Sequence, residues 1–244
     1  MIEVRGLHKS FGELKVLRGV DLQIPKGQIT VILGRSGVGK SVLLKHIIGL
    51  LRPDKGHIWI DKVDITQLGD RDLTEMRKKF GMLFQDAALF DSMTVGENVA
   101  FPLREHTKLR EQDIRKIVAH KLEQVGLPGL EEKMPAELSG GMKRRVGLAR
   151  AIALDPEIVL FDEPTAGLDP PMAEAIEHLI IETQRSLGRT FVAITHSILT
   201  AFHIGQKIAM LDEGRIIQEG PPETFRASKN RMVRNFLIRG EHEE

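Results

Sequence analysis

The 244-residue sequence has no cysteine and no tyrosine, and only one tryptophan. Without cysteine the chain can form no disulfide and can use no thiolate as a nucleophile or metal ligand, which suits a reducing compartment such as the cytosol. Charge of one sign is not in excess either, because 35 lysine and arginine residues oppose 34 aspartate and glutamate residues. This balance gives no electrostatic reason to expect a nucleic-acid partner.

Long apolar runs are also missing. The N-terminal segment "MIEVRGLHKSFG" lacks the apolar core of a secretory signal peptide. The most apolar run, "SVLLKHIIGLL", is short and contains Lys45 and His46, whereas a membrane-spanning helix needs about 20 apolar residues. If the protein works at a membrane, we expect another chain to cross it.

Two kinds of strand pattern occur along the chain. Three segments alternate apolar and polar residues, as half-buried antiparallel strands do: residues 2–7, 17–24 and 57–65. Three others are apolar on both faces, as buried parallel strands are: residues 29–34, 158–163 and 190–195. A helical pattern follows each of these, so we predict an α/β fold with a parallel-sheet core and an antiparallel β subdomain.

Residues 86–155 have a helical pattern. Within 112–126 the apolar residues fall on one helix face, namely Ile114, Ile117, Val118, Leu122 and Val125. We therefore predict a single domain, 1–244, in which a helical subdomain, 86–155, is inserted into a core with its β subdomain, 1–85 and 156–220. The tail, 221–244, is predicted to be a helix pair, and the charges of its final "EHEE" to be solvated.

The segment "GRSGVGKS", Gly34 to Ser41, fits the pattern G-x-x-x-x-G-K-[ST] between a buried strand and an apolar helix start. Glycines let backbone N–H groups surround a phosphate, and the helix N-terminus adds partial positive charge. Lys40 is predicted to reach the β- and γ-phosphates of a nucleotide, and Ser41 to bind Mg²⁺. The predicted nucleotide contacts are Gly34, Arg35, Ser36, Gly37, Val38, Gly39, Lys40, Ser41 and Val42. The simpler alternative is a glycine-rich turn between strand and helix.

An acidic pair ends the buried strand "IVLFDE". Open α/β sheets bind ligands at the carboxyl ends of their strands, where Asp162 and Glu163 are expected. Asp162 is predicted to hold Mg²⁺, and Glu163 to polarise the water that attacks the γ-phosphate. The alternative is an acid pair that only caps a helix.

A second glycine turn occurs in "ELSGGMKRRVGLARA". Ser139 is predicted to cap a helix over about 142–153, which would let Gly140 and Gly141 approach an anion. One nucleotide needs one primary phosphate cradle, so this second helix start is interpreted as serving the γ-phosphate of a nucleotide held by another copy. A two-fold homodimer would satisfy both sites, whereas the plain alternative is a capped helix with a flexible entry.

This turn, "LSGGMKRRVGLARA", resembles the signature motif of ATP-binding-cassette ATPases, and the resemblance extends over essentially the whole chain. It implies a P-loop ATPase with a RecA-like parallel core, ATP and Mg²⁺ as ligands, and a dimer that sandwiches two nucleotides. It also implies roles for four further residues. They are Gln85, which senses Mg²⁺ and links core to helical subdomain; Asp169, in the inter-subunit loop; His196, which contacts the γ-phosphate; and Phe11, which stacks on adenine. Each of the four, taken alone, also fits a surface, capping or packing role.

Met142 stands where most members have glutamine, and Ser197 replaces the usual aspartate after the histidine. With "PLREHT" and "KMPAELSGGM", Met142 makes the chain similar to the ATPases of Mla/Mce-type phospholipid transport systems. The implied partners are a membrane permease, an Mce-type substrate-binding protein and, in some systems, a small STAS-domain subunit. The implied location is the cytoplasmic face of the inner membrane.

In this family a coupling helix of the permease docks near residues 86–104. Phe90, Met93 and Val95 are predicted to supply apolar contacts there, with packing inside the helical subdomain as the alternative. Two other functions remain open at this point: an importer of polar amino acids, and a mechanical or regulatory ATPase of the divisome type that moves no substrate.

Overall fold

The computed structural model describes residues 2–243, and the surroundings of side chains in residues 2–238. The "EHEE" side chains predicted to be solvated therefore lie outside the described part. The chain forms two compact units, Met1–Arg77 with Thr190–Glu244, and Lys78–Arg189. No helix in the described residues has the length and hydropathy needed to cross a membrane.

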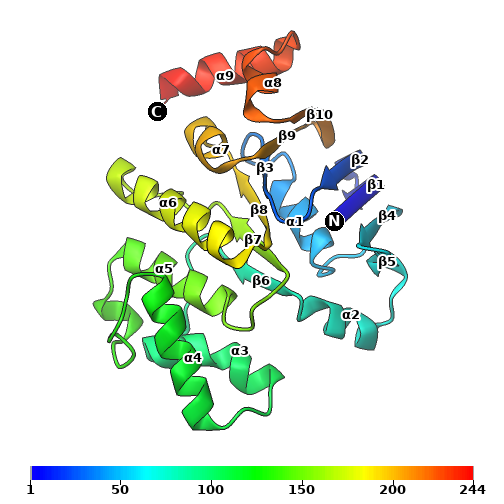
Figure 1. The fold of residues 1–244 in the computed structure, drawn as a ribbon. Helices are drawn as coiled ribbons and strands as arrows, with labels where there is room; N and C mark the ends of the chain where they lie inside the picture. The colour runs from blue at the N-terminus through cyan, green and yellow to red at the C-terminus, as the bar shows by residue number, and fades with distance from the viewer. Residues whose placement is uncertain (1, 244) are drawn as a thin grey trace. The chain divides into compact units, whose positions relative to one another are not determined.

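An antiparallel sheet opens the first unit, in the order β2-β1-β4-β5 (Figure 1). Its strands are β1 (Ile2–Phe11), β2 (Leu14–Ile24), β4 (Lys55–Ile60) and β5 (Val63–Asp64). Alternation buries one face, since Val4, Val20 and Ile58 are at most 1% exposed. The opposite face is polar, as the predicted two-residue period requires.

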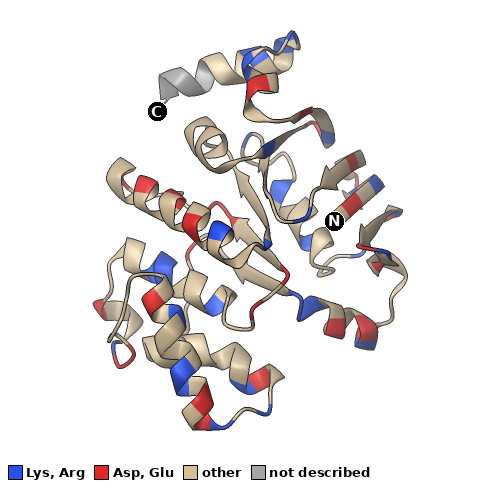
Figure 2. Ribbon diagram, in the orientation of Figure 1, with Lys and Arg blue, Asp and Glu red and all other residues tan. Residues whose placement is uncertain are grey.

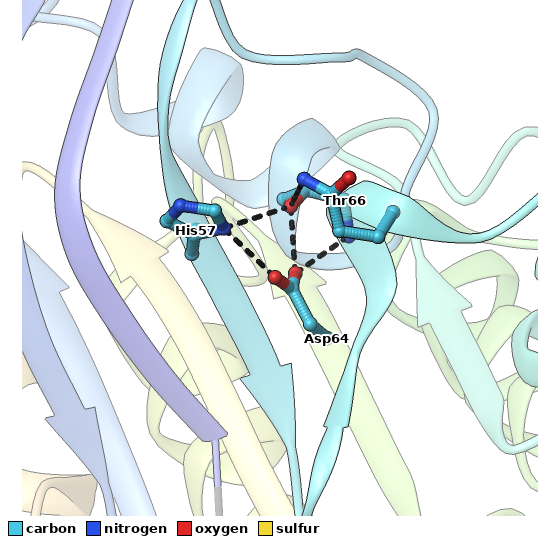
Figure 3. A network of polar contacts seen from close by, with 4 residues as sticks. His57, Asp64 and Thr66 are labelled. Carbon is cyan, nitrogen blue, oxygen red and sulfur yellow. Dashed lines mark hydrogen bonds and ion pairs between the residues drawn. The ribbon is translucent and has the colours of Figure 1, made fainter.

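A polar network joins β4 to the end of β5 and to the 3₁₀-helix that follows it (Figure 3). Asp64 accepts hydrogen bonds from His57 Nδ1 at 2.8 Å and from the hydroxyl of Thr66 at 2.6 Å, and it caps the short 3₁₀-helix Ile65–Gln67. Partial burial opposes ionisation of Asp64, but the hydrogen bonds from Thr66 and His57 outweigh it and lower the pKa of that carboxyl. Thr66 and Asp64 both contact Nδ1 of His57, whereas in a nucleophilic triad the acid and the hydroxyl contact different ring nitrogens. The network therefore stabilises the backbone and is not a catalytic triad.

The first unit also contains a mostly parallel sheet in the order β10-β9-β3-β8. β3 (Ile29–Leu33) runs parallel to β8 (Thr190–Thr195) and to β9 (Lys207–Asp212), whereas β10 (Arg215–Gly220) is antiparallel to β9. Every residue of β3 and β8 is buried, as the two-sided apolar pattern predicts. The helices of this unit are α1 (Lys40–Ile47), α2 (Asp70–Arg77), α7 (Ile198–Ile204), α8 (Pro222–Arg226) and α9 (Arg231–Glu243).

In the second unit, β6 (Phe80–Leu83) and β7 (Ile158–Asp162) form a parallel pair. Its helices are α3 (Val95–His106), α4 (Glu111–Gln124), α5 (Gly140–Ala151) and α6 (Pro170–Leu187), with the 3₁₀-helix Pro135–Glu137 before α5. Basic and acidic residues are interspersed along α4, whereas α6 carries glutamates followed by an arginine near its C-terminal end (Figure 2). The predicted apolar face of α4 is largely confirmed, because Ile114, Val118 and Leu122 are buried while Ile117 is half-buried. The α/β fold with parallel strands and an antiparallel sheet is confirmed.

Candidate functional site

The glycine-rich loop follows β3 in the first unit. Gly34 lies so close to the backbone carbonyl of Leu211 that a Cβ would collide with it. Gly37 and Gly39 have φ angles of 80° and 105°, in the region that favours glycine. Gly39 also precedes α1 as its N-cap, so the turn leads its backbone directly into the N-terminus of a helix. The loop has the backbone geometry of an anion cradle.

Lys40 is the first residue of α1 and is 5% exposed. Its ammonium donates hydrogen bonds to the carbonyl oxygens of Gly34, at 2.7 Å, and of Arg35, at 3.1 Å. These contacts curl the side chain back over the loop. A buried cation beside a glycine-rich loop at a helix N-terminus is suited to a polyphosphate. Ser41 is half-buried next to it and offers a hydroxyl, whereas Arg35 and Ser36 are exposed.

His196 lies at the same edge of this sheet as the loop. The register pairs Leu33 with Thr195, and the N–H of Gly34 donates to the carbonyl of Thr195 at 3.3 Å. His196 is the next residue and is exposed. Ser197, which replaces the usual aspartate, caps α7 by accepting from the N–H of Thr200 at 3.2 Å. The serine therefore keeps a capping function in the segment that carries His196.

The hairpin of β1 and β2 lies beside the loop. Phe11 ends β1, is 47% exposed, and has the Lys9 ammonium 5.6 Å from its ring centroid. A Cβ on Gly39 would lie 2.8 Å from Cγ1 of Val16. The contact of Val16 could not be predicted from the sequence, because a valine in a strand carries no signal that it contacts a distant glycine-rich loop.

At the corresponding edge of the second unit, β6 and β7 bring three predicted residues together. Leu83 pairs with Phe161, so Gln85 follows one strand end while Asp162 and Glu163 occupy the other. Gln85 is exposed and the two carboxylates are half-buried. Glu163 has a φ of 48°, an uncommon conformation for a residue with a side chain, of the kind that clusters at functional sites.

The second glycine turn begins α5 two residues earlier than predicted, at Gly140 instead of 142. The hydroxyl of Ser139 accepts from the N–H of Met142 at 3.3 Å, which is the predicted cap, and places both glycines in the first helical turn. Gly140 is exposed, but Gly141 is buried against Met172, whose sulfur a Cβ would strike. Packing against α6 therefore requires the second glycine, a contact that the sequence does not show.

Asp169 lies near this turn. Its carboxylate caps α6 by accepting from the N–H of Met172 at 3.0 Å. Arg144 of α5 is 6% exposed and donates to the carbonyl of Ala166 at 2.8 Å. Burial lowers the pKa of its guanidinium, and Asp86 opposes that shift. Arg144 thus links α5 to the segment that leads to Asp169, a role that the sequence does not reveal because its partner is a backbone carbonyl.

Arg150, near the end of α5, forms hydrogen bonds to the backbone of the segment that follows Gln85. It donates to the carbonyl oxygens of Ala88 and Ala87, at 2.7 and 2.6 Å. Both alanines have positive φ angles, 46° and 60°. The guanidinium therefore fixes a strained turn immediately after the predicted Mg²⁺ sensor.

Hydrogen bonds of Asn98 hold the centre of the predicted docking segment. Asn98 is buried and bonds to both backbone groups of Phe90 and to the carbonyls of Met93 and Thr94. Phe90 is 42% exposed, so its ring is open to a partner. Val95 is fully buried inside the helical part, so the expectation that it contacts a partner is wrong.

The chemistry of the donor set fits Mg²⁺ bound with phosphate. Ser41 and Asp162 supply hard oxygen ligands, and Gln85 an amide oxygen. Mg²⁺ usually takes one or two protein oxygens together with substrate phosphates and water, and needs no cage of side chains.

Known proteins are similar to this chain in sequence. The family model described as ABC transporter matches residues 17–166. The chain is 48% identical to the probable ribonucleotide transport ATP-binding protein mkl of Mycobacterium leprae, over 97% of this chain and 68% of that protein. It is 45% identical to the intermembrane phospholipid transport system ATP-binding protein MlaF of Haemophilus influenzae, over 97% of this chain and 90% of that protein. It is 48% identical to the methionine import ATP-binding protein MetN of Carboxydothermus hydrogenoformans, over 85% of this chain and 61% of that protein.

A solved structure resembles it as well. The dimeric post-hydrolysis state of the ATP-binding cassette MJ0796, bound to ADP and Pi, superposes with a TM-score of 0.82 and is 34% identical. The similarity covers 91% of this chain and 98% of that one.

Proposed function

This chain belongs to the ABC transporter family as an ATP-hydrolysing subunit, and on that premise we propose that it powers phospholipid transport across a cell envelope. The observation that carries the proposal is the match to MlaF, which is 45% identical and covered over 90% of its length. Of the three relatives compared, that protein is matched over the greatest share of its own chain. Met142 and "PLREHT" support the same assignment.

In the proposed reaction the loop 34–41 holds the phosphates of ATP. The helix N-terminus and the buried ammonium of Lys40 balance their charge, so the phosphates take over the hydrogen bonds that Lys40 makes to Gly34 and Arg35. Phe11 stacks on adenine, and Arg35, Ser36, Val38 and Val42 complete the contacts of the loop.

The groups for hydrolysis come from both units. Ser41, Asp162 and Gln85 would hold Mg²⁺, which would neutralise charge on the phosphates. Glu163 polarises the attacking water, and His196 contacts the γ-phosphate. The carboxylate of Glu163 is held by backbone in a sparsely populated conformation, which restricts where the carboxylate can point.

ABC cassettes form dimers, as MJ0796 does. We propose that Ser139, Gly140 and Gly141 of one copy close over the nucleotide on the loop of the other, with Asp169 in the contact. Ser139 and Gly140 are exposed at the N-terminus of α5, the end of a helix that favours an anion. ATP would bind the closed dimer better than the open one, and hydrolysis would release it.

The transport partners follow from the same assignment. A permease docks near residues 86–104, where Phe90 is exposed on a turn locked by Asn98. An Mce-type protein and, in some systems, a STAS-domain subunit complete the complex. The chain then works at the cytoplasmic face of the inner membrane, held there by its permease.

The match to MetN favours amino-acid import as a second candidate, and mkl is described as a probable ribonucleotide transporter. A non-transporting ATPase of the divisome type is a third. One preparation distinguishes them: the membrane complex is purified through a tag on this chain, and its bound lipids and proteins are identified by mass spectrometry. We expect an Mce-type protein and phospholipid.

Reconstitution then tests transport itself. The complex in liposomes should move labelled phospholipid on addition of ATP, and the Glu163→Gln complex should not. ATP-driven uptake of methionine or ribonucleotide with static phospholipid would overturn the proposal, as would ATP hydrolysis with no solute moved.

A further inference from the structure

A row of basic residues crosses the outer face of the antiparallel sheet. His8 on β1 is the register partner of Arg18 on β2 and also of Lys55 on β4, and all three side chains are exposed. Ser10 and Lys15 form the next cross-strand pair. Three basic side chains therefore stand side by side across three neighbouring strands.

Arg18 and Lys55 flank His8 on the two neighbouring strands, and two like charges so placed repel each other unless a carboxylate lies between them. Among the described residues, Lys15, Arg18, Lys55 and Arg215 form no ion pair with a carboxylate. Asp54 is nearby, but its two oxygens are engaged by the Lys9 ammonium at 2.9 Å and by the N–H of Ser10 at 2.6 Å. Sites that break a local rule of stability in this way are commonly functional.

The row lines a cavity of about 630 Å³. Lys15 and Arg215 bring two further cations to its wall, and Ser10 adds a hydroxyl. The ring of His8 is oriented by a hydrogen bond between Nδ1 and the carbonyl of Gly6 at 2.8 Å. Five basic side chains thus line one cavity, and the one carboxylate in its described lining, Asp54, is already paired with Lys9.

We propose that this cavity binds a small soluble anion carrying two or more phosphate groups. Arginine and lysine with a hydroxyl are the donors that recognise phosphate, and the cavity is large enough for a diphosphate with an organic group. Leu17 is the one apolar residue among the described residues that line the cavity, and its side chain is buried. We therefore assign the site to a free phosphorylated molecule, and the vesicle experiment below tests a lipid headgroup as its source.

The site is separate from the nucleotide loop. Within the described residues, neither Phe11 nor any residue of 34–41 lines the cavity. Val16 contacts Gly39 of the loop, whereas Lys15 and Arg18 on either side of it line the cavity. The chain is therefore expected to have two sites for phosphorylated anions, only one of which depends on Lys40.

Titration calorimetry with inorganic pyrophosphate, without Mg²⁺, tests the proposal by stoichiometry. The wild-type chain should bind two pyrophosphates. Lys40→Ala should bind one, in the cavity, and Arg18→Gln/Lys55→Gln should bind one, at the nucleotide loop. The double variant should weaken the cavity site at least about tenfold, as expected for the loss of two charge-assisted contacts. A single site in the wild type that Lys40→Ala abolishes, or two unchanged sites in the double variant, would overturn it.

The matched control is Lys26→Gln/Lys62→Gln, which removes the same charge from exposed positions of the same unit and should keep both sites. Thermal unfolding checks folding: at low salt Arg18→Gln/Lys55→Gln should melt no lower than wild type, because the repulsive row is relieved. Co-sedimentation with phosphatidylglycerol vesicles should not differ between wild type and the double variant. A difference there would identify a lipid surface and overturn the assignment to a soluble ligand.

Discussion

Glu163 combines a half-buried carboxylate with a left-handed backbone, whereas Asp162 one position earlier ends a regular strand. Strain of this kind costs about 1–3 kcal/mol and persists only where surrounding structure enforces it. The two neighbouring acids therefore present their carboxylates differently, which agrees with one binding a metal and the other acting on water.

Glu163→Gln should lower kcat for ATP about 10²–10⁴-fold, because the amide keeps the shape but cannot polarise water. KM for ATP should change little, since the phosphate contacts belong to the loop. Steady-state hydrolysis measures both constants. Glu182→Gln, an exposed position on α6, should leave them unaltered. Equal turnover in the two variants would remove the catalytic role of Glu163.

Asp64 makes a pH-dependent contribution to stability. Its pKa is below the ordinary value of 3.8 in the folded chain, so its contribution is present above that pH and is lost as pH falls through the folded value. Asp64→Asn should cost about 1 kcal/mol at neutral pH and progressively less in acid. Urea unfolding across the acid range measures this. With Asp91→Asn as control, a constant difference at every pH would contradict the account.

At the scale of elements, α5 is the helix that organises the second unit. Its first turn carries the predicted anion site, Arg144 reaches the segment before Asp169, and Arg150 reaches the turn after Gln85. One rigid element thus contacts two loops that carry predicted nucleotide residues. A shift of α5 would therefore move both loops.

Arg150→Lys should lower the free energy of unfolding by about 2 kcal/mol, because lysine cannot hold the carbonyls of Ala87 and Ala88 together and one charge-assisted hydrogen bond is lost. Denaturant unfolding measures the change. Arg185→Lys, exposed on α6, serves as the control and should be near neutral. If the two variants were equally stable, the loop would not depend on Arg150.

Elements were more predictable than their contacts. The buried strands 29–33, 158–162 and 190–195 follow from their apolar runs, and Ser139 was correctly predicted as a cap. The start of α5 was placed two residues late because glycine disfavours helix, whereas here packing against Met172 overrides that propensity. Val16, Arg144, Arg150 and Asn98 were missed, since their partners are backbone groups that periodicity does not reveal.

At the scale of the molecule, the compact units divide the chain at 78 and 189, whereas the predicted helical subdomain is 86–155. Periodicity identifies the type of an element but not the neighbours it packs against. The sequence prediction placed β6, β7 and α6 with the core, whereas in the structure they belong to the compact unit Lys78–Arg189. The functional division into core and helical subdomain remains a prediction. So does the second half of the nucleotide site, which the account assigns to another copy.

Ser139→Arg should block hydrolysis in the dimer while leaving ATP binding to a single chain intact, because the added side chain occupies the exposed helix start and not the loop. Fluorescent-nucleotide binding and steady-state turnover separate the two effects. Lys108→Arg, another exposed position in the same unit, is the control. Unimpaired turnover in Ser139→Arg would place the signature turn outside the site.

The most direct test of the account is the mass of Glu163→Gln in saturating ATP, measured by light scattering during gel filtration. The account predicts a dimer of twice the 27.3 kDa chain, and a monomer when Ser139→Arg is added to Glu163→Gln although ATP still binds. A monomer of Glu163→Gln with ATP bound, or a dimer that Ser139→Arg leaves intact, would contradict a nucleotide site shared between two copies.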